Sequence, residues 1–176
     1  MRETAAGIPE FHIQPGETCI VQGDAILRTV LGSCVGITFW NRRLELAALC
    51  HPMLPRYPAR AEAVIPAAAE RYVDSSIREI AARLKALGAD PGQTEVKLFG
   101  GADVLEIPRT DVRPTVGRLN AEAAARILRL ENFYTVASSL GGNCGLQIQF
   151  DSRTGEVLLR RLSCGILRRR GPDGRE

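Results

Sequence analysis

The sequence predicts a mixed α/β protein in which a layered β-sheet or sandwich is flanked by two main helices. Short apolar segments bounded by polar turns recur between residues 26 and 162, a pattern typical of strands. Two longer segments repeat apolar residues every three or four positions, which is the period of an amphipathic helix. The chain has 176 residues, 45% of them hydrophobic, so it can bury the core of one domain.

The predicted strands lie before, between and after the two helices. They cover residues 26–30, 35–40, 44–49, 95–99, 133–138, 146–150 and 157–162. The short polar turn at residues 41–43 predicts a hairpin of the second and third strands. Residues 151–155 predict another hairpin, formed by the last two strands.

The first helix is predicted over residues 72–87 and ends near Gly88, before Pro91. Its apolar stripe consists of Tyr72, Val73, Ile77, Ile80, Ala81, Leu84 and Leu87. The second helix is predicted over residues 116–130. Its apolar stripe consists of Val116, Leu119, Ala123, Ile127 and Leu130.

Composition argues against several classes of function. The net charge is +3 and aromatic residues make up 5% of the chain, with no basic stretch interleaved with them, so nucleic acid is not an expected partner. No apolar run approaches the ~20 residues that a membrane-spanning helix needs, so membrane insertion is not expected. The first residues lack the basic-then-apolar order of a secretory signal. We therefore expect a cytoplasmic protein.

The cysteines do not form a recognisable framework. They are scattered, odd in number and without a Cys-x-x-Cys pair: Cys19, Cys34, Cys50, Cys144 and Cys164. Such a pattern does not predict a set of disulfides. Four of the possible ligands, Cys50, His51, Cys144 and Cys164, would make a zinc site if they converged. The simpler interpretation is that most of the cysteines are small buried residues.

One cysteine and one histidine stand out as a candidate catalytic pair. Cys34 lies between Gly32 and Gly36 at the start of an apolar strand, where glycines allow a substrate to approach the backbone closely. His51 ends the neighbouring strand. If these strands pair in an antiparallel hairpin, their outer ends lie side by side, and a histidine near a thiol favours the nucleophilic thiolate.

Other interpretations of this segment remain open. A cysteine and a histidine on adjacent strands are often no more than packed residues. Ser33 is an alternative nucleophile, but it lacks the Gly-x-Ser-x-Gly elbow. Cys50 adjoins His51 and should face the opposite side of the strand. His12 is expected to be an exposed bystander in a loose N-terminal stretch.

Several motifs together resemble the signature of the chemoreceptor glutamine deamidase family, CheD. The resemblance covers roughly residues 17–162. The motifs are the residue runs 31–36, 51–55, 97–102, 117–120, 140–143 and 154–157, together with Phe150. We therefore expect an N-terminal extension over residues 1–16, a CheD-like deamidase domain over residues 17–165 and a flexible basic C-terminal tail over residues 166–176.

The resemblance implies an α/β fold shared with deamidating bacterial toxins, and it implies roles for particular residues. Cys34 matches the family nucleophile and His51 the family base. The third catalytic residue of the family is a threonine six residues before the cysteine, a position that Arg28 holds here. We assign the role to Thr29, although a shift of one residue on a strand turns the side chain to the other face unless a bulge intervenes. Leu146 stands where many relatives have an arginine.

The implied reaction is the conversion of glutamine side chains on methyl-accepting chemotaxis receptors to glutamate and ammonia, through a thioester on Cys34. It requires no metal or organic cofactor. The implied partners are the cytoplasmic region of these receptors and, where it exists, the phosphatase CheC. Two alternatives remain: hydrolysis of receptor glutamate methyl esters by the same pair, and a non-catalytic adaptor that binds receptors or a CheC-type phosphatase. The adaptor remains an alternative because Arg28 stands where the family has its third catalytic residue.

Overall fold

The fold consists of two five-stranded sheets and two helices. The computed structural model describes residues 2–3, 7–58, 69–104 and 114–163. One sheet contains, in spatial order, β1 (Arg2–Glu3), β2 (Pro9–His12), β4 (Ile26–Leu31), β9 (Leu146–Asp151) and β10 (Val157–Arg161). The other contains β3 (Thr18–Gln22), β6 (Leu46–Cys50), β5 (Val35–Asn41), β7 (Glu95–Gly100) and β8 (Thr135–Leu140).

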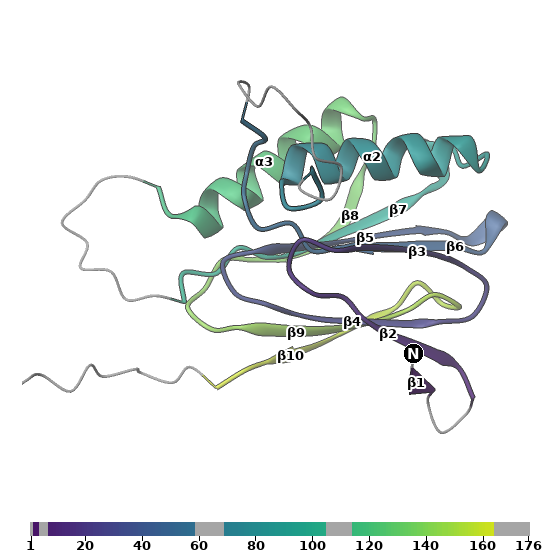
Figure 1. The fold of residues 1–176 in the computed structure, drawn as a ribbon, viewed down its shortest axis with the longest axis horizontal. Helices are drawn as coiled ribbons and strands as arrows, with labels where there is room; N and C mark the ends of the chain where they lie inside the picture. Colours follow the sequence, from purple (N-terminus) through teal and green to yellow (C-terminus); the bar gives the residue numbers. More distant parts are fainter. Residues whose placement is uncertain (1, 4–6, 59–68, 105–113, 164–176) are drawn as a thin grey trace, which may run out of the picture.

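The elements stack in three layers. The helices α2 (Val73–Ala86) and α3 (Val116–Leu130) lie together on one face of the β3-β6-β5-β7-β8 sheet, and the second sheet lies against its other face (Figure 1). The predicted fold class, a layered sandwich flanked by two main helices, is confirmed. None of the helices in the described ranges is long and apolar enough to cross a membrane.

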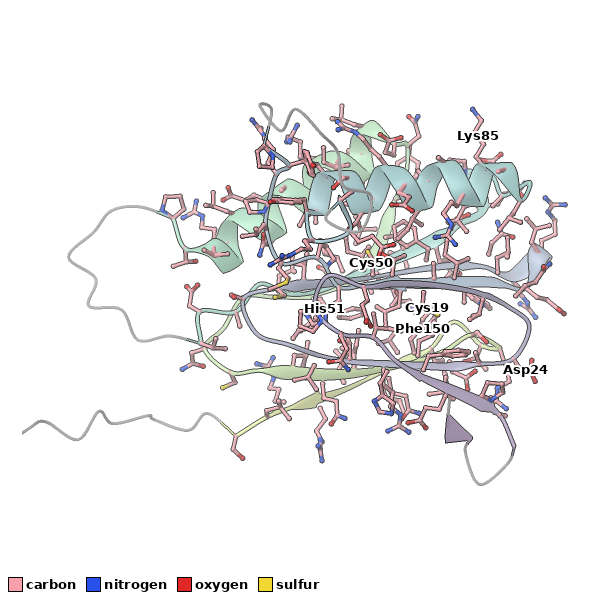
Figure 2. The ribbon with its side chains drawn as sticks, in the orientation of Figure 1. Cys19, Asp24, Cys50, His51, Lys85 and Phe150 are labelled. Atoms are coloured by element: carbon pink, nitrogen blue, oxygen red, sulfur yellow. The ribbon has the colours of Figure 1, made fainter. Side chains whose placement is uncertain are left out.

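Two cores fill the spaces between these layers. The first lies between the helices and their sheet, and it includes Ile37, Phe39, Ile77 and Ile127. The second lies between the two sheets, where Figure 2 shows Phe150. Strand β9 shows why the second core forms, because its residues alternate regularly between buried and half-buried positions. This two-residue period places every second side chain between the sheets.

Most predicted elements are confirmed with small shifts at their ends. Strands β5 and β6 pair antiparallel, as do β9 and β10, so both predicted hairpins form. Strand β6 begins at Leu46 rather than at residue 44, because residues 42–44 form a short 3₁₀ turn, η1 (Arg42–Leu44). The turn ends at Glu45, which has a φ of 52°.

The predicted apolar stripe of α3 is wrong in part. Its buried positions are Gly117, Asn120, Ala123, Ala124, Ile127 and Leu128. Val116, Leu119 and Leu130 are exposed instead. The buried face is therefore rotated at the start of the helix, where a glycine and an asparagine face the interior.

The N-terminal residues contribute strands that were not predicted. No strand is expected before residue 26, yet β2 pairs parallel with β4, and β3 pairs antiparallel with β6. The stretch around His12 is thus part of a sheet rather than loose. The expectation that His12 is exposed is confirmed, since its side chain is 48% accessible. The domain boundaries stay predictions, and the tail at 166–176 lies outside the described residues.

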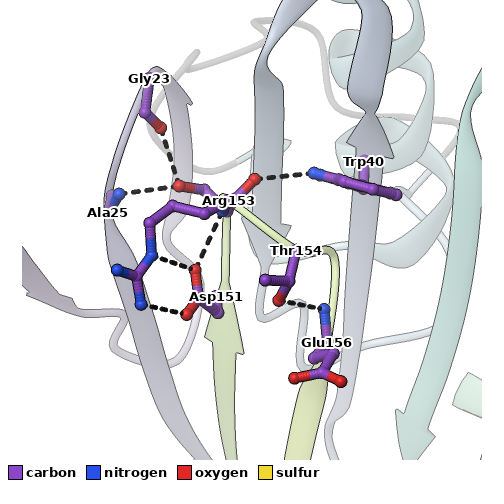
Figure 3. A network of polar contacts seen from close by, with 8 residues as sticks. Gly23, Ala25, Trp40, Asp151, Arg153, Thr154 and Glu156 are labelled. Carbon is purple, nitrogen blue, oxygen red and sulfur yellow. Dashed lines mark hydrogen bonds and ion pairs between the residues drawn. The ribbon is translucent and has the colours of Figure 1, made fainter.

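A network of polar contacts joins the β9–β10 turn to both sheets (Figure 3). The Ser152 hydroxyl donates to the Gly23 carbonyl and accepts from the Ala25 amide, each at 2.7 Å. The Trp40 indole N–H, from the other sheet, donates to the Ser152 carbonyl at 2.7 Å. These bonds pair buried polar groups and fix the two sheets relative to each other at this end.

We expect the core between the sheets to contribute strongly to stability. Phe150→Ala should lower the free energy of unfolding by about 3–5 kcal/mol, because it removes a large, fully buried side chain and leaves a cavity. Leu158→Ala is the control, because Leu158 is 64% exposed and its loss should change stability by less than about 0.5 kcal/mol. Urea unfolding measures both. Equal effects would contradict this assignment of the core.

Candidate active site

The β5–β6 pairing brings the two candidate catalytic residues to neighbouring strand ends. Ile37 lies opposite Cys50 in the ladder, and the Val35 amide donates to the Pro52 carbonyl at 3.3 Å. Cys34 therefore precedes β5 at the end where His51 follows β6. Among the described residues no hydrogen bond joins the Cys34 sulfur to the His51 ring, whose Nε2 atom is buried without a partner.

His51 lies between the two sheets. Its side chain is 1% exposed, and Figure 2 shows it on the face of its sheet that looks toward the second sheet. Cys50 lies on the other face, in the core beneath the helices, where its thiol donates to the Ile37 carbonyl. The expected opposite orientation of these neighbours is confirmed. Cys50 and His51 thus do not converge on one metal.

A hydrogen-bond relay fixes the protonation of the His51 ring. The Thr29 hydroxyl on β4 lies 2.7 Å from the His51 Nδ1 atom and 2.7 Å from the Ile13 carbonyl oxygen. A carbonyl only accepts, so the hydroxyl proton must go to Ile13. The Nδ1 atom then donates its own proton to the Thr29 oxygen. His51 is consequently the Nδ1–H tautomer, and its Nε2 atom carries a free lone pair.

Thr29, not Arg28, is the residue that reaches the histidine. The β4 strand places Thr29 on its buried face, between Leu27 and Leu31. Arg28 is only half-buried, and its guanidinium lies 3.1 Å from the Glu10 carboxylate. The strand alternation that cast doubt on Thr29 is therefore what directs it toward His51.

Both candidate catalytic groups favour their neutral forms. Burial lowers the pKa of His51 to about 4, although the Ile13 carbonyl and the Glu17 carboxylate oppose this effect. Burial also raises the pKa of the Cys34 thiol, with its own backbone N–H opposing. Of the two resting states that the sequence left open, a thiol beside a neutral imidazole fits these shifts better than a preformed thiolate–imidazolium pair.

The loop that carries Cys34 is held from behind by three hydrogen bonds. The Gly32 carbonyl accepts from the Ala102 amide at 2.9 Å, and the Cys34 carbonyl accepts from the Gly101 amide at 2.8 Å. The Ser33 carbonyl accepts from the side-chain amide of Asn120 at 2.9 Å. The Gly32–Cys34 loop is therefore rigidly oriented by β7, the residues after it, and α3.

The glycines near this loop serve close packing. Gly100 has a φ of +93°, and a Cβ atom there would lie 2.4 Å from the Cys34 carbonyl oxygen. Gly36 is buried, and its Cβ would lie 2.8 Å from Leu31, so its role is to let the sheets pack rather than to let a substrate approach. A side chain at Gly100 would displace the Cys34 backbone itself, and one at Gly36 would displace Leu31.

Some residues that contribute to the site were not predicted from the sequence. Ile13 contributes only a backbone carbonyl, and no residue pattern reveals such a role. Asn120 offered a signal, because it is a polar residue next to apolar positions of a predicted helix, within one of the motifs. Cys144, which has no contact with the candidate catalytic residues in the bonds described above, is disulfide-bonded, and the cysteine spacing did not indicate this.

Comparison with known proteins identifies the family. Residues 53–161, which are more than half of the chain, match the family described as CheD chemotactic sensory transduction. The chain belongs to the CheD family. The resemblance inferred from the motifs is confirmed, and the matched range includes the residues that hold the Cys34 loop from behind, Gly101, Ala102 and Asn120.

Individual CheD relatives align along most of the chain. A Geobacter sulfurreducens protein named probable chemoreceptor glutamine deamidase CheD 2 is 38% identical over 156 residues, covering 89% of this chain and 92% of that protein. A Thermococcus kodakarensis protein named probable chemoreceptor glutamine deamidase CheD is 35% identical, covering 89% and 95%. A Rhodospirillum rubrum protein of the same name is 33% identical, covering 90% and 86%.

The buried histidine should make stability depend on pH. Unfolded His51 binds a proton below about pH 6.5, whereas the folded ring does so only near pH 4. The stabilisation is therefore complete above pH 6.5 and decreases as the pH falls toward 4, by about 3 kcal/mol in all. Urea unfolding at pH 7 and pH 4.5 measures the loss.

The comparison that isolates His51 uses two variants. His51→Asn should lose less stability than the wild type between the two pH values, because no imidazole is left to protonate. Leu158→Ala, which changes an exposed side chain that carries no titratable group, should behave as the wild type does. The assignment is wrong if His51→Asn keeps the full pH dependence of the wild-type protein.

Proposed function

We propose that this protein deamidates glutamine side chains of methyl-accepting chemotaxis receptors, with Cys34 as nucleophile, His51 as base and Thr29 as the residue that orients the base. The observation that carries the proposal is the Thr29–His51 hydrogen bond of 2.7 Å, which leaves the Nε2 atom as an unpaired base. Membership of the CheD family and the names of its relatives supply the reaction and the substrate.

In the first half-reaction, the His51 Nε2 atom takes the Cys34 proton as the sulfur attacks the glutamine carbonyl carbon. A carbon–sulfur bond forms, and the electron pair of the carbonyl double bond moves to oxygen. The tetrahedral intermediate collapses when its nitrogen takes the proton from Nε2. The carbon–nitrogen bond breaks, ammonia leaves, and a thioester remains on Cys34.

In the second half-reaction, a water molecule gives a proton to Nε2 and its oxygen attacks the thioester carbon. The carbon–sulfur bond breaks, the sulfur recovers the proton, and the product is glutamate. The imidazolium forms twice, and each time Nδ1–H donates to Thr29 while Thr29 donates to Ile13. The relay thus stabilises the charge without losing a proton.

The two rival functions are affected differently by the geometry. The adaptor hypothesis rested on Arg28, which stands at the sequence position of the third catalytic residue. In space, the residue beside His51 is Thr29 instead. The methylesterase uses the same groups, because a thioester forms from an ester as readily as from an amide. The leaving group, ammonia or methanol, separates the esterase from the deamidase.

The deciding experiment follows receptor glutamines by mass spectrometry. Purified protein incubated with a receptor cytoplasmic fragment should raise the mass of glutamine sites by the amide-to-acid change, and Cys34→Ala should abolish this. Cys19→Ala is the matched control, because Cys19 is also a free, half-buried cysteine but lies on β3 rather than in the Gly32–Cys34 loop. Binding without conversion would support the adaptor. Loss of methyl groups alone would support the esterase. Co-purification with a CheC-type phosphatase tests that partner.

Substitutions at Thr29 should test the orienting role. Thr29→Val keeps the shape and removes the hydroxyl, and it should lower kcat about 10- to 150-fold, the value of a hydrogen bond to a charged group. Thr29→Ser should restore most of the activity. Arg28→Ala is the control and should leave kcat unchanged, since Arg28 pairs with Glu10 instead. A larger loss in Arg28→Ala than in Thr29→Val would reverse the assignment.

A further inference from the structure

We infer that Asn120 is a positioning residue that orients the peptide bond between Ser33 and Cys34, so that the Cys34 N–H can donate a hydrogen bond to the oxyanion of the reaction. The inference rests on the proposed function, and it names a residue and an atom that the Cys34, His51 and Thr29 set does not include.

Asn120 is the point where three segments of the site meet. It lies on α3, is fully buried, and its Nδ2 group donates to two backbone carbonyls, those of Ser33 and Met53, each at 2.9 Å. Ser33 directly precedes Cys34, and Met53 lies two residues after His51. One side-chain amide thus links the loop of the candidate nucleophile to the segment of the candidate base.

The bond to Ser33 determines where the Cys34 N–H points. A trans peptide is planar, so its C=O and N–H groups point in opposite directions, and the described residues contain no cis peptide bond. Because the Ser33 carbonyl points toward Asn120, the Cys34 N–H points away from α3. The Cys34 N–H also lies close enough to its own sulfur to oppose the burial effect on the thiol pKa.

The Cys34 N–H is available, whereas the next amide is not. The Val35 N–H is occupied by the Pro52 carbonyl at 3.3 Å. In the part of the chain that the structure describes, the Ser33 and Cys34 amides donate to no backbone acceptor, and the Cys34 amide has only its own sulfur nearby. Their carbonyl partners, on Gly32 and Ser33, are both held from behind. Successive N–H groups fixed in this way form a site for an anion.

The chemistry of asparagine suits this task. Of the two polar atoms of the asparagine side chain, only the nitrogen is a donor, and its two protons can serve two carbonyls at once. The two carbonyl partners therefore determine the orientation of the side chain. The Oδ1 atom has no hydrogen-bond partner within the described residues, although it is buried. Leaving a buried acceptor unpaired costs free energy. The two hydrogen bonds that Nδ2 donates, and not Oδ1, therefore determine how the Asn120 side chain is placed.

Asn120→Asp is the sharpest variant, because it keeps the shape and exchanges the two donors for an acceptor. The carboxylate repels the Ser33 carbonyl and attracts the Cys34 N–H, so the peptide should turn over. Removing one oxyanion donor should lower kcat for deamidation roughly 100- to 1,000-fold. Alkylation of Cys34 by iodoacetamide should slow far less than deamidation, because that displacement develops no charge on a carbonyl oxygen and loses only the N–H beside the sulfur.

Asn41→Asp is the matched control. Asn41 is also a buried asparagine, and its Nδ2 group donates to the Gln93 carbonyl and to the Thr94 hydroxyl, far from Cys34 in the ladder. The same chemical change there should leave both deamidation and alkylation at wild-type rates. Parallel losses of both rates in Asn120→Asp would mean that Asn120 only holds the fold, and an unchanged kcat would exclude any role. Either result overturns the inference.

Crystal structures give a readout that does not depend on the receptor substrate. In Asn120→Asp the Ser33–Cys34 peptide should be reversed, and an unreversed peptide contradicts the inference. In the wild type, a peptide aldehyde should add to Cys34 as a hemithioacetal, whose oxygen should lie about 2.7–3.1 Å from the Cys34 nitrogen. An oxygen directed elsewhere also contradicts it. If the wild type leaves receptor glutamines unchanged, the proposed function fails while these structural tests still decide the orientation.

Discussion

The bond between Thr29 and the His51 ring is the interaction on which the candidate site depends. It spans the space between the two sheets, at 2.7 Å, and joins β4 of one sheet to the residue that follows β6 of the other. The Thr29 proton is committed to the Ile13 carbonyl, so the ring must use its own Nδ1 proton and present Nε2 as a base. A buried imidazole would otherwise rotate or exchange tautomers. The sandwich therefore sets the chemistry of the ring through the distance between its layers.

The rest of the fold supports the partner of that ring. Cys34 sits on a loop between strands of different sheets, and such a loop has little regular hydrogen bonding of its own. Here Gly101, Ala102 and Asn120 bind its carbonyls, and Gly100 leaves room for the Cys34 carbonyl. The motifs that follow residue 97 and residue 117 are thus explained by what they do for the loop, although they are far from it in sequence.

The sequence predicted the elements well where their hydrophobic pattern was regular. Strands β5 and β9 and both helices follow from their periodicity, and the two hairpins follow from their turns. Strand β2 was missed because it is short and contains Glu10 and His12, and β3 was missed because only three apolar residues lie between its polar ends. The face of α3 was misjudged because Gly117 and Asn120 are buried for close approach and hydrogen bonding, and neither property registers as hydrophobicity.

The site was predictable only in part, for a related reason. Cys34 and His51 follow from strand pairing and motif, but the choice between Arg28 and Thr29 depends on which face of β4 is buried. That face is decided by Leu27 and Leu31, which pack against the β3-β6-β5-β7-β8 sheet, and this tertiary contact cannot be read from the sequence. Alternation along the strand then carries the answer to Thr29. Backbone contributors such as the Ile13 carbonyl leave no trace in a sequence.

Because His51 and Cys34 are both neutral at rest, the surrounding dipoles act on charges that develop only during the reaction. Burial keeps His51 unprotonated and Cys34 a thiol, so charge separates only as the sulfur attacks. Positive charge then appears on the buried ring and negative charge on the substrate oxygen. Groups already oriented toward those charges stabilise the transition state more than the ground state. The Ile13–Thr29 relay can meet the first charge and the Cys34 N–H the second, and both are fixed before a substrate arrives.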